Sequence, residues 1–322
     1  MDAIILGGGD DTRLWPITRY RPATLLPVGE STVLDRTLSA LDAEPRISDV
    51  YVTTDDRFAD QYTTYLEDES SADANVVTQP STNDGTSTGE VATVTQLTGR
   101  DGIEDDVFVV PGGTLIDVDV AAFIDAFQEE RTPTLAWGDG RTRERPTSTD
   151  TVRADGGGAL ESSGDHPDGI DGPLDSIACC GFPAESRHLL ETYRQEAEGR
   201  DELDGLARWL LEEESARTVA VEGRSFDVGT PEGYLDAVAR TLEGDAVVDP
   251  SASIENARIG ANVHVMADAT VREATLEDTV VFPETTIHDA HLSRTVVDRG
   301  ASVEGLTLDG SLIAQHTKVY AK

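Results

Sequence analysis

The first residues in this sequence that could do chemistry are three glycines near the amino terminus. Gly7, Gly8 and Gly9 follow an apolar stretch that ends at Leu6. Glycines let a backbone approach a ligand closely, and the exposed N–H groups of such a turn favour phosphate oxygens. Arg13 follows, and its fork of donors suits a phosphate, although a structural ion pair would also explain it. The pattern predicts a site for a phosphorylated ligand.

The elements that must position these residues alternate between strands and helices from residue 1 to about 244. Such alternation predicts an α/β fold with a mostly parallel sheet covered on both faces, whose ligands gather at the carboxyl ends of the strands. The predicted strands are Ala3–Leu6, Val50–Thr53, Val76–Thr78, Val107–Val110, Thr134–Trp137, Ile177–Cys180 and Thr218–Val221. The predicted helices are Val33–Leu41, Ala59–Leu66, Glu90–Leu97, Ala121–Phe127, Leu189–Ala197, Leu203–Leu211 and Pro231–Leu242.

Residues 146–175 interrupt this alternation. They are rich in Gly, Asp and Ser and nearly free of large apolar side chains. A loop of this length is usually a functional flap or a disordered segment. The sequence leaves both interpretations open.

The pattern changes at about residue 245, where apolar residues recur in steps of 6, 5 and 5 residues. Three apolar lines result: Val265, Val281, Val297 and Ile313; Val271, Ile287, Val303 and Val319; and Leu276, Leu292 and Leu308. Neither helices nor hairpins produce this spacing, so it predicts a three-sided parallel β-solenoid, with Gly260, Gly300 and Gly310 at its corners.

The composition restricts the partners and the setting. The formal net charge is −37, with 62 acidic residues against 25 Lys plus Arg. Such a surface repels nucleic acid and anionic membranes, and we expect neither as a partner. It suits a cytoplasm of very high salt, as in a halophilic archaeon. The sequence has no signal peptide pattern and no apolar run long enough for a membrane span, so we expect a soluble, cytoplasmic protein. The adjacent Cys179 and Cys180 are interpreted as buried small apolar residues.

Three segments resemble the sugar-1-phosphate nucleotidylyltransferases, which make NDP-sugars. The family signature reads roughly L-A-G-G-x-G-T-R-L-x-P, then P-K-x-L-x-P-V, and later D-x-G-T-P-E-x-Y. The matching segments here are Leu6–Pro16, Pro22–Val28 and Asp227–Tyr234. The resemblance implies a Rossmann-like nucleotidyltransferase domain over residues 1–244. It also implies a short, hexapeptide-type left-handed β-helix domain over residues 245–322.

The resemblance also implies roles for single residues. Leu6, Gly7, Gly8 and Gly9 match the stretch that receives the base and ribose, with Gly7 where alanine is usual. Arg13 matches the arginine that contacts the triphosphate.

Two further matches each leave an alternative open. Gln79, with Gly85 and Thr86, resembles the segment that reads the base edge, but an ordinary surface loop fits equally well. Asp227 matches one of the two carboxylates that hold Mg²⁺ in the family. Its segment also has the pattern of a capped helix start.

Four departures fall on parts of the site that do chemistry. Asp11 replaces a glycine and Ala23 a lysine, and Gly113 stands where the ungapped match to V-L-N-G-D-x-L-x-D places the first metal-binding aspartate. The E-K-P segment, whose lysine contacts the sugar phosphate, has no counterpart in 138–175. No lysine can compensate, because residues 1–317 contain none.

Other residues could restore part of this site. The charge could come from Arg19, Arg21, Arg141, Arg143 and Arg145, and a metal site could be rebuilt from Asp10, Asp11 or Asp117.

The family reaction joins a nucleoside triphosphate to a sugar-1-phosphate and releases pyrophosphate, and the protein's task is to position two anions and neutralise charge. The departures favour an impaired or regulatory paralogue, a pseudoenzyme that binds a nucleotide or NDP-sugar. The alternative is an active Mg²⁺-dependent glucose-1-phosphate thymidylyl- or uridylyltransferase, or a mannose-1-phosphate guanylyltransferase. A β-helix acyltransferase using His264, His288, His291 or His316 is a third class, but solvated turns explain these histidines more simply. We expect the β-helix to mediate a homo-oligomer or a complex with an active paralogue; the alternative is a monomer with a capped end.

Overall fold

The computed structural model describes residues 1–8, 12–68, 70, 72–79, 88–99, 102–137, 152–154, 160–162, 177–196, 201–213, 215–220 and 223–321. Contacts between residues divide the chain into two compact units. Unit 1 consists of Met1–Asp10 and Leu34–Ser225, and unit 2 of Asp11–Val33 and Phe226–Lys322. The arginine-bearing part of the first signature therefore packs with residues that follow in sequence more than 200 positions later. The domain boundary at residue 244 stays a prediction.

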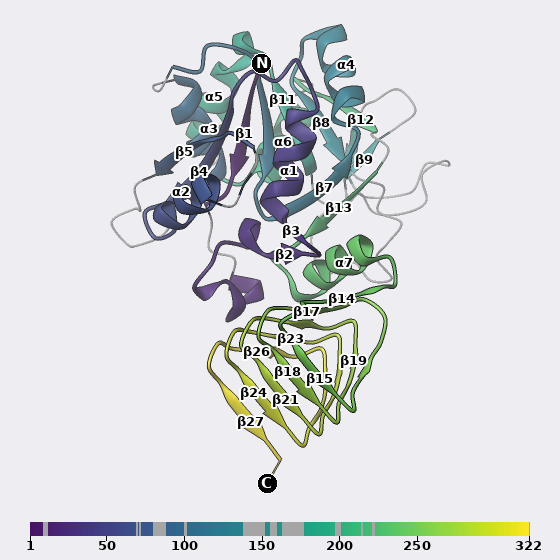
Figure 1. The fold of residues 1–322 in the computed structure, drawn as a ribbon. Helices are drawn as coiled ribbons and strands as arrows, with labels where there is room; N and C mark the ends of the chain where they lie inside the picture. The colour runs from purple at the N-terminus through teal and green to yellow at the C-terminus, as the bar shows by residue number, and fades with distance from the viewer. Residues whose placement is uncertain are drawn as a thin grey trace. The chain divides into compact units, whose positions relative to one another are not determined.

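Unit 1 is built on a seven-stranded sheet with the order β12-β8-β11-β6-β1-β4-β5 (Figure 1). Its strands are β1 Asp2–Leu6, β4 Val50–Asp55, β5 Asn75–Gln79, β6 Val107–Pro111, β8 Thr134–Trp137, β11 Ile177–Phe182 and β12 Arg217–Ala220. Only β11 runs antiparallel to its two neighbours in this sheet. The predicted α/β fold with a mostly parallel sheet is confirmed, and each predicted strand is present in it.

The predicted helices are also present, and their ends differ from the predictions by a few residues. They are α1 Val33–Asp42, α2 Ala59–Asp68, α3 Glu90–Gly99, α4 Val120–Glu130, α5 His188–Glu196, α6 Leu203–Glu212 and α7 Pro231–Leu242. Of these, α7 belongs to unit 2. Strand β7 (Thr114–Val118) and strand β13 (Gly223–Asp227) were not predicted.

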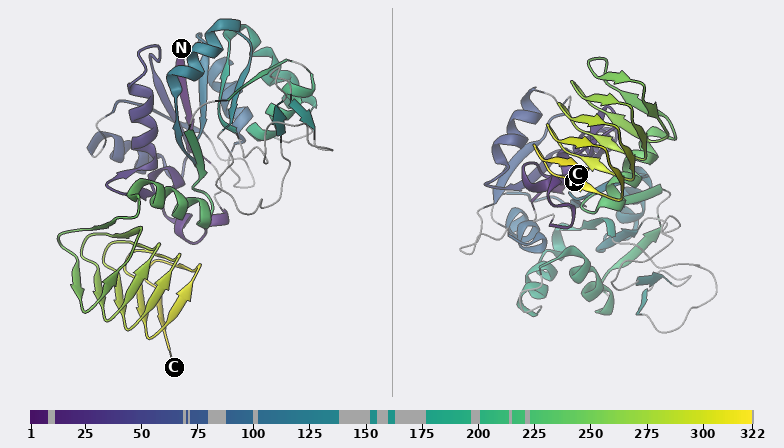
Figure 2. Two further views of the ribbon diagram at one scale, coloured as in Figure 1. Left: turned by 90° about the vertical axis from the view of Figure 1, so that its right-hand side faces the viewer. Right: turned by 90° about the horizontal axis from the view of Figure 1, so that it is seen from below.

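Alternate residues of the central strands face opposite sides of the sheet. One side packs against α3, α5 and α6 in a single apolar cluster that includes Ile4, Val109 and Phe182. On the other side the ring of Phe108 lies 5.2 Å from that of Phe123 in α4. Figure 2 shows helices on both sides of the sheet. The sheet is thereby held between apolar side chains on both of its faces.

Part of the segment 146–175 forms a short hairpin, which the sequence did not predict. Strands β9 (Val152–Ala154) and β10 (Leu160–Ser162) pair antiparallel. The rest of that segment lies outside the described residues. Cys179 and Cys180 are buried, free cysteines in β11, as predicted.

Unit 2 begins with three 3₁₀ turns, η1 (Thr12–Leu14), η2 (Ile17–Arg19) and η3 (Ala23–Leu25). A small hairpin of β2 (Pro27–Val28) and β3 (Ser31–Thr32) follows. Helix α7 is joined to this hairpin by a hydrogen bond from the Tyr234 hydroxyl to the Pro27 carbonyl (2.9 Å). The second signature segment is therefore held against the helix that begins within the third.

The remainder of unit 2 is a three-sided parallel β-helix (Figures 1 and 2). The first side stacks β14 Ala246–Val248, β17 Val263–Val265, β20 Val280–Val281, β23 Val296–Val297 and β26 Leu312–Ile313. The second stacks β15 Ser253–Glu255, β18 Thr270–Arg272, β21 Thr286–His288, β24 Ser302–Glu304 and β27 Lys318–Tyr320. The third stacks β16 Arg258–Ile259, β19 Thr275–Glu277, β22 His291–Ser293 and β25 Thr307–Asp309.

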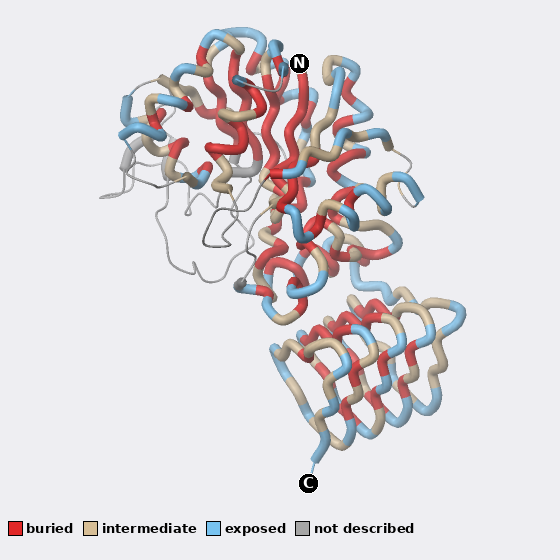
Figure 3. The backbone as a smooth tube through the Cα atoms, turned by 90° about the vertical axis from the view of Figure 1, so that its left-hand side faces the viewer, coloured by how far each residue is buried: buried red, intermediate tan, exposed pale blue. Residues whose placement is uncertain are grey.

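The three predicted apolar lines are the stacked positions of these sides. Val281 pairs with Val265 and Val297, Ile287 with Val271 and Val303, and Leu292 with Leu276 and Leu308. Figure 3 shows buried residues recurring along the stacked coils. Gly300 and Gly310 have positive φ angles of 64° and 59°, as tight corners require. The architecture is consistent with the predicted left-handed β-helix. Among the described residues, no helix is both long and apolar enough to cross a membrane.

Candidate functional site

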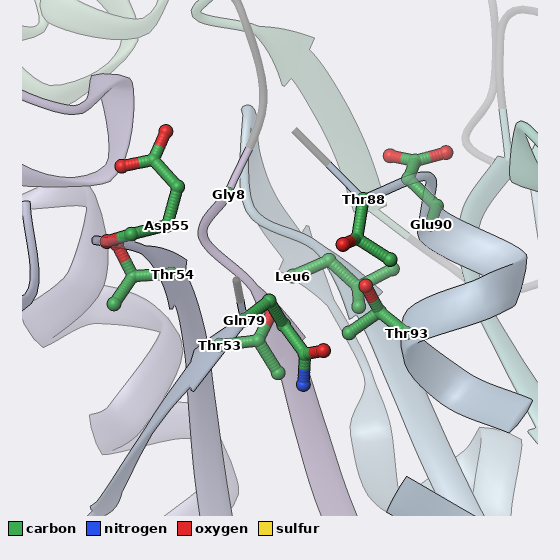
Figure 4. A pocket seen from close by; sticks show the side chains of 9 residues that line it. All are labelled: Leu6, Gly8, Thr53, Thr54, Asp55, Gln79, Thr88, Glu90 and Thr93. Carbon is green, nitrogen blue, oxygen red and sulfur yellow. The ribbon is translucent and has the colours of Figure 1, made fainter. Parts of the chain in front are cut away.

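A pocket in unit 1 lies at the carboxyl ends of β1, β4 and β5, the edge where ligands of parallel sheets gather (Figure 4). Most of its lining residues are polar: Leu6, Gly8, Thr53, Thr54, Asp55, Gln79, Thr88, Glu90 and Thr93. Figure 4 shows Leu6 and Gln79 between Thr54 and Asp55 on one side and Thr88, Glu90 and Thr93 on the other. The pocket therefore extends from the end of β1, where the glycines follow, to Gln79, the last residue of β5.

Gln79 is the one lining residue whose polar group is buried without compensation among the described residues. Gln79 is only 4% exposed. Neither its Nε2 nor its Oε1 has a hydrogen-bond partner in the described part of the chain. An unsatisfied buried polar group costs about 1–3 kcal/mol, and native proteins keep few of them without a functional reason. An amide offers a donor beside an acceptor, which is the complement of a nucleobase edge.

The backbone beside this pocket explains why Gly7 replaces the alanine usual in the signature. The Tyr62 hydroxyl donates a hydrogen bond to the Gly7 carbonyl (3.0 Å). A Cβ atom on Gly7 would lie 2.4 Å from that hydroxyl oxygen and 2.7 Å from the Thr53 carbonyl oxygen. Only glycine fits there without a shift of the neighbouring strand.

In unit 2, Arg13 of η1 and Asp227 form a two-pronged ion pair. Nη1 lies 2.9 Å from Oδ2, and Nη2 donates to Oδ1 at 3.3 Å. The Arg13 side chain is 64% exposed and that of Asp227 is 22% exposed. The backbone N–H of Gly229 also donates to Oδ1, at 3.1 Å. The structural ion pair left open for Arg13 is therefore present, with the predicted metal-binding aspartate as its partner.

The capped-helix pattern of the third signature is also present. The Thr230 hydroxyl accepts a hydrogen bond from the N–H of Gly233 (3.1 Å), and Pro231 occupies the first helical position of α7. Because Pro231 lacks an N–H and has a fixed φ, it suits that position. This cap fixes the backbone immediately after Asp227.

The described residues do not fit the family's Mg²⁺ site. Such a site takes oxygen ligands in near-octahedral geometry, supplied in the family by two carboxylates. Gly113 has no side chain to offer, and both oxygens of Asp227 are paired with the Arg13 guanidinium. No group of three or more His, Cys, Asp or Glu among the described residues could hold a metal ion. Asp10 and Asp11, two of the residues proposed to rebuild the site, lie outside the described residues.

The arginines expected to replace the missing lysines are only partly available. Arg21 is paired with Asp298 of the β-helix (2.7 Å), and Arg19 lies over the ring of Tyr20. Arg141, Arg143 and Arg145 lie outside the described residues. Ala23, at the position of the family lysine, is buried in η3 and carries no charge.

The predicted binding residues thus fall into three sets. Leu6, Gly8 and Gln79 line the pocket of unit 1, with Gly7 next to it. Arg13 and Asp227 meet in unit 2. Gly9, Gly85 and Thr86 lie outside the described residues. The sequence analysis missed the threonines and acids of the pocket, although the carboxyl end of β4 was a signal for Thr53, Thr54 and Asp55.

Comparisons with known proteins agree with this fold. The profile of a family described as nucleotidyl transferase matches residues 2–244. A curated relative, the bifunctional protein GlmU of Methanococcus aeolicus, is 24% identical over 243 residues, or 76% of this chain. The match spans 55% of that relative's length. A similar solved structure is a putative glucose-1-phosphate thymidylyltransferase from Bacillus anthracis in complex with a sucrose. It has a TM-score of 0.61 at 17% identity and covers 75% of this chain and 95% of the other.

Proposed function

The chain belongs to the nucleotidyl transferase family, in its sugar-1-phosphate type, and from this membership we propose that it binds a nucleoside triphosphate or an NDP-sugar without efficient transfer. Its site is degenerate, which makes it an impaired or regulatory paralogue. The observation that carries the binding part is the buried amide of Gln79, which lacks a partner among the described residues. A base edge in the pocket would supply the missing donor and acceptor.

The loss of efficient transfer follows from the chemistry of the site residues. Transfer brings two anions together, so the protein must neutralise the charge that develops between them. Ala23 stands where the family has a lysine, and Gly113 stands where it has a metal-binding aspartate. The remaining aspartate, Asp227, is paired with Arg13. Unit 1 still supplies the amide of Gln79 for a base edge, and unit 2 supplies the guanidinium of Arg13, which suits a phosphate.

The alternative is an active enzyme with a metal site rebuilt elsewhere. The test is pyrophosphate release by the purified protein in concentrated KCl with Mg²⁺. UTP, dTTP, GTP, CTP and ATP are each combined with the 1-phosphates of glucose, mannose, galactose and N-acetylglucosamine. We expect no turnover above background, together with thermal stabilisation by at least one nucleotide or NDP-sugar. Turnover that Asp227→Ala abolishes would instead establish the active enzyme.

The β-helix is proposed to mediate self-association or association with an active paralogue, in a cytoplasm of high salt. Solenoid faces and ends are surfaces that natural proteins use for binding or must cover. Light scattering of the purified chain, alone and mixed with an active relative, measures both associations. A monomer in both samples would contradict this part of the proposal.

A further inference from the structure

The Arg13–Asp227 pair leaves the cation more available than the anion. Both oxygens of the Asp227 carboxylate are engaged: Oδ2 lies 2.9 Å from Nη1 of Arg13 in an ion pair, and Oδ1 accepts hydrogen bonds from Nη2 of Arg13 and the N–H of Gly229. A guanidinium has five N–H donors, and this contact engages only its two Nη nitrogens. With its side chain 64% exposed, Arg13 can receive an acceptor from solvent while it stays bound to Asp227.

Asp227 is itself fixed by a local turn. Its backbone carbonyl accepts hydrogen bonds from the Thr230 N–H (3.2 Å) and the Thr230 hydroxyl (2.9 Å). The same hydroxyl caps α7 by accepting from the Gly233 N–H. A Cβ atom on Gly233 would lie 2.0 Å from the Asp227 carbonyl oxygen, so the turn closes tightly. The turn therefore holds the backbone at Asp227 and the Gly229 N–H holds its carboxylate, whereas Arg13 contributes the longer and more exposed side chain.

A divalent cation would have to displace this arrangement. To coordinate a metal through the oxygens that now face Arg13, Asp227 would give up charge-assisted hydrogen bonds, and Gly113 provides no second carboxylate to compensate. Arg13, by contrast, already carries a positive charge. Bidentate recognition of phosphate is the geometry that a guanidinium fork suits best.

We propose that this chain binds nucleotide phosphates without a divalent cation, with Arg13 as the built-in cation and Asp227 as the positioning residue that holds its guanidinium. The proposal rests on the nucleotide-binding function proposed above and changes the assignment of Asp227. In the family resemblance this aspartate is a metal ligand. Here it orients an arginine.

The test compares ligand affinity by calorimetry in two buffers of equal ionic strength, one with Mg²⁺ and one with EDTA. The ligands are the five nucleoside triphosphates and inorganic tripolyphosphate, which has no base and so probes Arg13 independently of the pocket. We expect affinities in the two buffers to agree within about twofold, less than the loss of one charged hydrogen bond would cause. Arg13→Ala should weaken binding about tenfold or more in both buffers, and Arg13→Lys should restore only part of it because an ammonium lacks the fork.

The Asp227→Asn variant distinguishes the two roles that Asp227 could have, a positioning residue for Arg13 or a metal ligand. As a positioning residue, it weakens binding equally in both buffers, by up to about fivefold, the range of exposed ion pairs. Arg272→Ala, which removes the exposed pair with Glu255 on the β-helix, is the matched control and should change nothing. A direct titration with Mn²⁺ alone should show no saturable site that depends on Asp227.

Three results would overturn the inference. The first is an affinity that falls about tenfold or more on removal of Mg²⁺ in the natural chain but not in Asp227→Asn. The second is saturable Mn²⁺ binding that Asp227→Asn abolishes. The third is tighter phosphate binding by Asp227→Asn in EDTA, which would make Asp227 a competitor of the ligand. Metal-free binding of tripolyphosphate with no binding of any nucleotide would leave the metal-free phosphate site of Arg13 and Asp227 standing and refute the nucleotide-binding function.

Discussion

Arg21 Nη2 lies 2.7 Å from Oδ1 of Asp298, whose side chain is completely buried in the β-helix. The backbone N–H of Arg299 donates to the same oxygen, and the Arg21 guanidinium lies 4.3 Å from the centre of the Phe282 ring. Arg21 lies between the first two signature segments, in the same Asp11–Val33 stretch of unit 2 as Arg13, so this pair ties that stretch to the β-helix within unit 2.

Removing Arg21 should destabilise the protein strongly, because it leaves the buried carboxylate of Asp298 without its cation. We expect Arg21→Ala to lower the free energy of unfolding by about 3–5 kcal/mol, measured by urea denaturation. Arg272→Ala removes an exposed ion pair with Glu255 and should cost less than about 1 kcal/mol. Similar small losses for both variants would show that the buried pair contributes no more than a surface pair.

Gln79→Leu should separate binding from stability. Leucine of similar size removes the buried amide that lacks a partner among the described residues, so the free protein should gain up to about 1–3 kcal/mol in free energy of unfolding. The same change should weaken nucleotide binding about tenfold, because a base edge would lose its hydrogen bonds. Chemical denaturation and calorimetry measure the two effects. A variant that loses stability while it keeps its affinity would contradict a base-reading amide.

Leu292→Ala should destabilise the β-helix through more than one coil. Leu292 is 2% exposed and stacks between Leu276 and Leu308, so truncation leaves a cavity shared by three coils. We expect a loss of about 2–5 kcal/mol, measured by urea denaturation. Leu308→Ala, at a half-buried position of the same line, is the control and should cost clearly less. Equal losses would mean that burial along this line does not set stability.

His264 should make stability depend on pH. Burial lowers the pKa of this histidine, while the charges of Asp249 and Glu30 oppose the shift. The folded state therefore binds fewer protons than the unfolded state, whose histidine pKa is about 6.5. The contribution of neutral His264 to the free energy of unfolding is fully present above about pH 6.5, the pKa of the unfolded state. It is lost as the pH falls toward the lower pKa of the folded state. Denaturation midpoints from pH about 8 to about 5 should fall less in His264→Gln than in the natural chain. Parallel curves would contradict this.

Salt should stabilise the folded chain because of its net charge of −37. The Debye length shrinks from about 10 Å at about 0.1 M salt to about 3 Å at about 1 M, which screens the repulsion among surface carboxylates. We expect the thermal midpoint to rise steadily with KCl, as measured by circular dichroism. A midpoint independent of KCl would argue against adaptation to a cytoplasm of high salt.

The sequence by itself determined the elements and the architecture. The strands of the seven-stranded sheet, the helices and the three lines of the β-helix follow from apolar periodicity, because side chains repeat with the geometry of each element. The short strands β7, β9, β10 and β13 did not. The start of α7 at Pro231 could also be predicted from the sequence, since helix capping depends on neighbouring residues. The glycine signature pointed to the strand end where the pocket lies.

Only the tertiary structure decided the partners of the chemical groups. Arg13 and Asp227 lie 214 positions apart, and Arg21 and Asp298 lie 277 apart, so no local pattern could pair them. The sequence could nominate Gln79, but not reveal that its amide is buried without a partner among the described residues. Local periodicity sets secondary structure, whereas hydrogen bonds and ion pairs between distant residues exist only once packing brings their side chains together.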